Sequence, residues 1–129
     1  MARAILLISI LFLIAGITHA KSYDLKKNVG EYAAEIRIDR DPPSLGDNNI
    51  EIEIKDAAGK RVTDAKVLVH YYMPPMPRMV PMNYRTDAQL KKDRYRATMN
   101  LIMSGPWVIA VIITRDGKTK TAKFNVDVQ

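Results

Sequence analysis

Methionine is concentrated in one short, proline-rich segment of the chain, residues 70–84. The sequence holds seven methionines. Four of them recur at every third position of this segment: Met73, Met76, Met79 and Met82. The methionine thioether is a soft, uncharged ligand that suits Cu(I), and it stays usable outside the cell, where thiols oxidise. One interpretation of the segment is therefore a Cu(I) site.

The prolines limit the backbone that this segment can adopt. Each one fixes φ near −65° and removes a backbone donor, so the segment cannot form an inner strand. We expect polyproline II, whose roughly three residues per turn place the four thioethers along one edge. Three residues of that helix advance about 9 Å, whereas sulfurs that share one copper lie within roughly 4 Å of each other, since each bond is about 2.3 Å. Four ligands on one ion would therefore need the segment to bend. We expect a shell of two or three methionines, with Met76 and Met79 central. The supporting candidates are Met73, Met82, Met103 and His70.

Two other interpretations of the methionines remain open. Methionine is a flexible filler, so the segment could cap one end of a hydrophobic core. It could also be an adaptable docking surface for a partner. Met99 is in phase with an alternating strand and is expected in the core, whereas Met103 ends that strand and could face the segment. His70 is expected on the strand face opposite Val69, either exposed or hydrogen-bonded.

Composition excludes several classes of function. The chain has no cysteine, which excludes a disulfide framework, a cysteine zinc site and a thiol nucleophile. The net charge is +6, but the basic residues alternate with acids and lack interleaved aromatics, so no nucleic-acid binding is expected. A positive net charge does favour acidic partners or anionic surfaces. We expect one solvent-exposed strand face to carry Glu51, Glu53 and Lys55. We expect no enzymatic activity.

The amino terminus has the pattern of a secretory signal. Arg3 precedes an apolar run over residues 4–17, and small residues follow up to Ala20. The run is short against the roughly 20 residues needed to cross a bilayer. We expect residues 1–20 to form a signal helix that is cleaved, which leaves a periplasmic or secreted protein. The alternative is a retained anchor that holds the domain to the membrane, facing the periplasm. Residues 21–32 are expected to be a loose lead-in.

Residues 33–129 show the alternation of short strands. Apolar residues at every second position mark strands with one buried face, and turn residues separate them. The alternating runs are Ile36–Ile38, 50–54, 65–71, 95–101, 107–113 and 122–128. This pattern predicts an all-β protein, a single β-sandwich of about seven strands.

The order of several short motifs resembles the YtkA-like domain, which is related to the extramembrane domain of FixH proteins. These motifs are Pro-x-x-Gly-x-Asn (43–48), Asp-x-x-Gly (56–59), Ala-x-Val (65–67), a loop that begins Met-Pro-x-Met-Pro (73–79), Tyr-x-Ala (95–97) and Met-x-Gly-x-Trp (103–107). The resemblance covers residues 33–129.

The resemblance implies an immunoglobulin-like sandwich in the bacterial envelope and no established enzymatic activity. It also implies partners that handle copper, assemble copper-containing oxidases or export heavy metals. The ligand candidates that it carries over are Met73, Met76, Met79 and Met103. This chain has Arg78 where glycine is common, and that cation would repel a metal ion. It also lacks the additional histidines of some relatives and a long FixH-type membrane segment.

Overall fold

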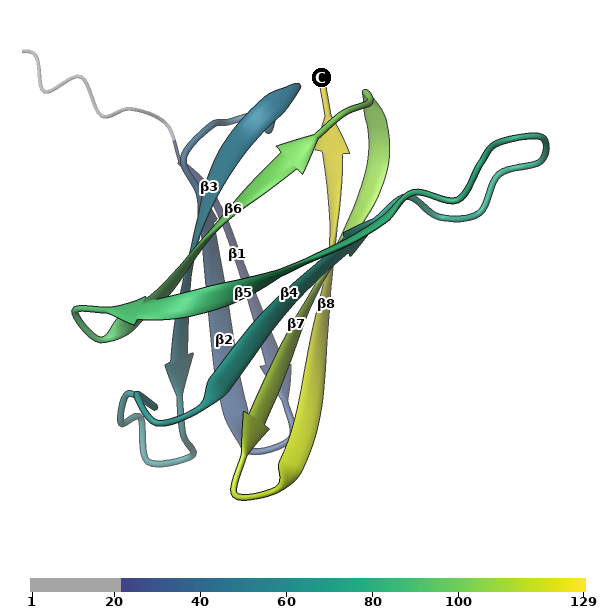
Figure 1. Cartoon of the computed structure of the whole chain (residues 1–129). Coiled ribbons are helices and arrows are strands. Elements are labelled where there is room, and N and C mark those ends of the chain that lie inside the picture. The colour runs from purple at the N-terminus through teal and green to yellow at the C-terminus, as the bar shows by residue number, and fades with distance from the viewer. Residues whose placement is uncertain (1–21) are drawn as a thin grey trace, which may run out of the picture.

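The structure, a computed structural model, describes residues 22–129 and forms a sandwich of eight antiparallel strands (Figure 1). The strands are β1 (Tyr23–Val29), β2 (Tyr32–Ile38), β3 (Gly46–Lys55), β4 (Lys66–Tyr72), β5 (Asn83–Lys91), β6 (Arg94–Leu101), β7 (Gly105–Arg115) and β8 (Lys118–Val128). Within this range there is no helix long and apolar enough to cross a membrane. The predicted signal segment, residues 1–20, lies outside the described residues.

The strands follow the order β1-β2-β3-β6-β5-β4-β7-β8. Strand β5 turns the corner between the two layers, because residues 83–88 pair with β4 and residues 89–91 pair with β6. The two outermost strands, β1 and β8, lie side by side (Figure 1). A side-chain bond joins them, in which Lys27 Nζ donates to the carbonyl of Lys123 over 3.0 Å. The predicted β-sandwich is therefore confirmed, with eight strands in a nearly closed arrangement.

Alternation along each strand builds the core between the layers. The inward isoleucines of β2 and β3 are fully buried, and Trp107 and Ile109 meet them from β7. Burial of this apolar surface drives folding at about 25 cal/mol per Å². Met99 is completely buried, so its predicted core position is confirmed.

The segment predicted to be a loose lead-in instead contains β1. Its residues pair with β2 along the whole strand, from Tyr23 opposite Ile38 to Val29 opposite Tyr32. Tyr23, Leu25 and Val29 are half-buried and pack against the core. Polar residues outnumber these three apolar positions, so the sequence signal for a strand was weak. Pairing with β2 and burial against the core determine the structure here.

The outer face of β3 and β6 carries ion pairs. Arg94 contacts both Glu51 and Glu53, and the second contact is 3.1 Å long. Burial by itself would raise the pKa of Glu53, but the hydrogen bond from Lys55 and the charges of Arg61 and Arg94 lower that pKa below its ordinary value of 4.5. The Glu53 carboxylate is therefore held ionised by the neighbouring cations at neutral pH.

Candidate metal centre

The methionine-rich segment forms a hairpin loop between β4 and β5. This loop, residues 73–82, is called the methionine loop below, and it projects from the ends of both strands (Figure 1). At its base the Met73 N–H donates to the Met82 carbonyl over 3.2 Å. Near its tip the Met79 N–H donates to the Met76 carbonyl over 3.3 Å. The methionine spacing predicts one extended polyproline II helix. That prediction is wrong, because the backbone of the segment reverses.

The reversal is a tight turn at Pro77 and Arg78. Proline at the second position, a positive φ at the third and a bond from the fourth residue to the first are the features of a type II turn. Arg78 holds that third position with φ of 65°. Only glycine adopts such a φ without cost. In this chain an arginine bears the backbone strain.

The reversal places all four loop methionines around one pocket of about 70 Å³. The lining residues are Met73, Pro74, Pro75, Met76, Met79, Val80, Pro81 and Met82. The hairpin opposes Met73 to Met82 and Met76 to Met79, so the thioethers need not follow one another along a single edge. The bend that four ligands require is thus present in the backbone.

Exposure rises along the methionine loop from base to tip. Met73 is 8% exposed and belongs to the core cluster, whereas Met79 is 38% exposed. Met76 and Met82 are half-buried. Val80, at the tip, is 80% exposed. The pocket therefore runs from the core of the sandwich to the solvent.

An aromatic cluster supports the base of the loop. The ring of Tyr71 stacks on Tyr84 with centroids 5.5 Å apart, and the ring of Trp107 lies 6.1 Å from Tyr71 and 6.4 Å from Tyr84. Met73 directly follows β4, and Met82 directly precedes β5. Both pack in or against the same core. The base of the pocket is thus fixed by apolar contacts.

The corner between β6 and β7 meets the loop at Met73. A Cβ atom on Gly105 would lie 3.2 Å from the Met73 methyl group, and Gly105 has φ of +122°. Met103 is half-buried at this corner, packs against the core and accepts a 2.9 Å hydrogen bond from Trp107 Nε1 through its carbonyl. Met103 does not line the pocket, so the corner reaches the loop through Gly105.

His70 lies apart from the four loop methionines. It alternates with the buried residues Val69 and Tyr71, so it points to the outer face of β4, as predicted. Its Nε2 is hydrogen-bonded to Oδ1 of Asn83, and its ring lies 4.8 Å from that of Tyr72. His70 does not line the pocket. Among residues 22–129, no group of three or more histidine, cysteine, aspartate or glutamate side chains is placed to hold a metal ion.

The pocket suits a soft, weakly charged ion. Its lining consists of methionines, prolines and a valine, so the thioether sulfur is the one ligating side-chain atom among these residues and no carboxylate is present. Hard divalent cations need oxygen ligands, which these side chains lack. The methionine spacing does not predict the place of Val80 in the pocket or the closure of the loop, although Pro77 at the centre of the loop is a turn signal.

Fold and site together define an all-β domain with a methionine-lined pocket at one end. The chain matches the family described as YtkA-like over residues 26–112 and belongs to that family. The soluble domain of PmoD from Methylocystis sp. ATCC 49242 (Rockwell) has a similar fold, with a TM-score of 0.57 and 16% sequence identity. That match covers 81% of this chain and 97% of the PmoD domain. No curated protein matches the chain significantly.

Proposed function

We propose that this chain is an exported, non-enzymatic envelope protein that holds or hands over Cu(I) through the methionine loop. The observation that carries the proposal is the single pocket lined by four thioethers. The absence of cysteine from the sequence leaves methionine as its soft ligand. The chain belongs to the YtkA-like family, and the copper-handling partners that this resemblance implies support the same assignment.

The exposure gradient suggests how the ion would move. Met79 is the most exposed thioether, so Cu(I) enters and leaves there, and Met76 lies next to it across the turn. Met73 and Met82 supply the deeper sulfurs. Thioethers bind weakly and carry no charge, so an acceptor can replace them one at a time without separating an ion from a buried carboxylate. This exchange is the expected transfer mechanism.

The remaining sequence candidates have supporting roles in this proposal. Met103 holds the corner against which Met73 packs. To join a copper shell, the His70 side chain would have to break its hydrogen bond to Asn83 and turn from the outer face of β4 toward the methionine loop. The expected partner is an envelope protein that handles copper, assembles an oxidase or exports metal.

The test is an anaerobic Cu(I) titration of residues 21–129, which contain the whole sandwich, in competition with a chromophoric chelator. Wild-type protein is expected to bind one ion. The Met76→Leu/Met79→Leu variant keeps apolar bulk and removes sulfur, so it should lose binding. Met99→Leu is the matched control, because Met99 is buried in the core. Equal affinities in all three proteins, or no binding by wild type, would refute the proposal.

A second candidate function is docking of the same loop on a membrane complex or efflux partner without metal. The exposure of Val80 and Met79 at the loop tip favours it. Leucine should replace methionine in a docking surface with little loss, whereas Val80→Asp should abolish partner binding. If replacing methionine by leucine abolishes the function of the loop and Val80→Asp does not, the loop is a metal site.

A further inference from the structure

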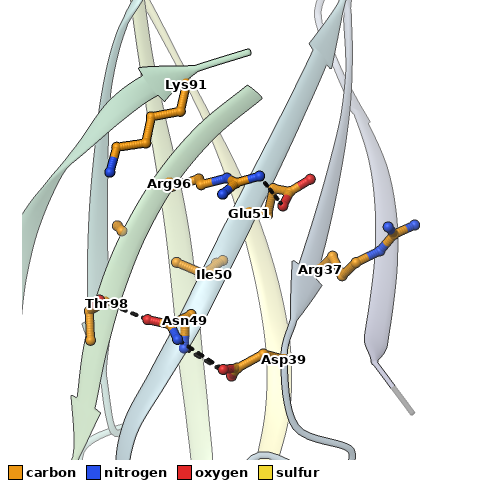
Figure 2. Close-up of a pocket in the computed structure, with 9 residues that line it drawn as sticks. Arg37, Asp39, Asn49, Ile50, Glu51, Lys91, Arg96 and Thr98 are labelled. Carbon is orange, nitrogen blue, oxygen red and sulfur yellow. Dashed lines mark hydrogen bonds and ion pairs between the residues drawn. The ribbon is translucent and has the colours of Figure 1, made fainter. Parts of the chain in front are cut away.

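A charged cleft of about 370 Å³ lies over β2, β3 and β6, on the outer face of the layer that these strands form with β1 (Figure 2). Its lining residues are Arg37, Asp39, Asn49, Ile50, Glu51, Lys91, Arg96, Ala97 and Thr98. None of them belongs to the methionine loop. The cleft is therefore a second site, separate from the candidate metal centre.

Strand register places two arginines on either side of one carboxylate. Arg37 of β2 is opposite Glu51 of β3, and Glu51 is opposite Arg96 of β6. Figure 2 shows the same row, with Glu51 between the two guanidinium groups. The row is fixed by backbone pairing of three strands, so the Cα atoms of the two arginines are held at a set separation.

The acceptor atoms of the cleft are already engaged. Asp39 uses both carboxylate oxygens on Asn49, one on the backbone N–H at 2.9 Å and one on the side-chain amide at 3.0 Å. The amide oxygen of Asn49 accepts from the Thr98 hydroxyl at 2.9 Å. Each oxygen of Glu51 contacts a different arginine, Arg94 or Arg96. A cationic ligand would therefore find no unengaged carboxylate oxygen in this wall.

The donor atoms, by contrast, have spare capacity. Lys91 is exposed and forms no ion pair within residues 22–129. Arg37 reaches Asp24 through Nε alone, at 3.2 Å, and the two side chains are 45% and 44% exposed. Such an exposed pair contributes little and exchanges readily. Arg96 contacts Glu51 through one terminal nitrogen at 3.4 Å, although a guanidinium offers five N–H donors.

We propose that this cleft binds an acidic peptide segment of a partner protein. Carboxylates of the peptide would pair with Arg37, Arg96 and Lys91, since these supply unused donors and positive charge. The cleft is open to solvent. A smaller neighbouring cleft of about 50 Å³ shares Arg37 and Glu51 with it but is lined by three glutamates, so the peptide carboxylates would lie in the larger cleft. An extended chain fits this shape better than a compact ligand, which is usually enclosed. The net charge of +6 also favours an acidic partner.

The test measures binding of a fluorescent oligo-glutamate peptide to residues 21–129 at low ionic strength. Arg37→Gln/Arg96→Gln should weaken binding about tenfold, because two solvent-exposed ion pairs with the peptide are lost. Arg85→Gln/Lys118→Gln is the matched control. It removes the same charge from exposed positions outside both clefts. Thermal unfolding of all variants establishes that each is folded.

Four outcomes decide the proposal. Selective loss in the Arg37/Arg96 variant supports it, and binding should then weaken as salt rises. Equal loss in both double variants would overturn it, since net charge alone would explain the affinity. Absence of peptide binding by wild type would overturn it as well. Citrate or inorganic phosphate that bound as tightly as the peptide would show that the cleft takes a small anion. The Cu(I) affinity of the Arg37/Arg96 variant should equal that of wild type.

Discussion

Arg78→Gly should stabilise the tip of the methionine loop. A residue with a side chain costs roughly 1–2 kcal/mol in the left-handed conformation, and Arg78 adopts it with φ of 65°. Glycine removes this cost but gives the opened loop more conformational freedom, worth about 0.5–1 kcal/mol. The midpoints of these two ranges leave a net stabilisation of the turn of about 0.75 kcal/mol.

Hydrogen exchange at the Met79 amide measures this effect, because that N–H closes the turn on the Met76 carbonyl. The predicted stabilisation slows exchange through local opening by about two- to fivefold. Arg78→Ala is the control, since it removes the charge and keeps Cβ. Alanine should not slow exchange. If glycine left the rate unchanged, or if alanine slowed it equally, the assigned backbone strain would be wrong.

Three further predictions concern stability, each measured by urea unfolding. Gly105→Ala should cost about 1–3 kcal/mol, because alanine cannot relax at φ of +122° and its Cβ would crowd the Met73 methyl group; an unchanged midpoint would contradict the close approach. Tyr95→Phe should cost about 1–2 kcal/mol, since the buried hydroxyl donates to the Val62 carbonyl over 3.1 Å; a neutral effect would mean that this bond adds nothing. Glu53→Gln should be less stable than wild type at neutral pH. The pKa of Glu53 is lowered by folding, so its contribution is present above pH 4.5 and is lost as the pH falls through the folded-state value. The difference between the two proteins should therefore shrink in acid, and a constant difference would contradict the pKa shift.

Alternation predicted most of the sandwich because its strands bury one face. Ile50, Ile52 and Ile54 are the clearest case, since all three are buried and the residues between them are not. Strand β1 escaped prediction because its stability comes from pairing with β2 and from contact with the core. Long-range contacts of this kind leave no periodic signal.

The sequence singled out the four methionines that line the pocket, but it did not predict the shape of the pocket or the separate positions of Met103 and His70. The spacing of the methionines indicated soft-metal chemistry, but it suggested an extended segment. The turn at Pro77 and Arg78 opposes the thioethers across a hairpin instead. The strand alternation that puts His70 on the outer face of β4 was visible in the sequence, whereas its bond to Asn83 depends on the pairing of β4 with β5.

The arrangement of four thioethers around one ion is tested most directly by nuclear magnetic resonance of the methionine methyl groups. Residues 21–129 would carry labelled methionine methyls, and their resonances would be followed during an anaerobic Cu(I) titration. The methyls expected to shift together, saturating at one equivalent, are Met73, Met76, Met79 and Met82. The buried Met99 should not shift. Shifts confined to Met103 or to the His70 ring, or no shift at one equivalent, would contradict a copper site in the methionine loop.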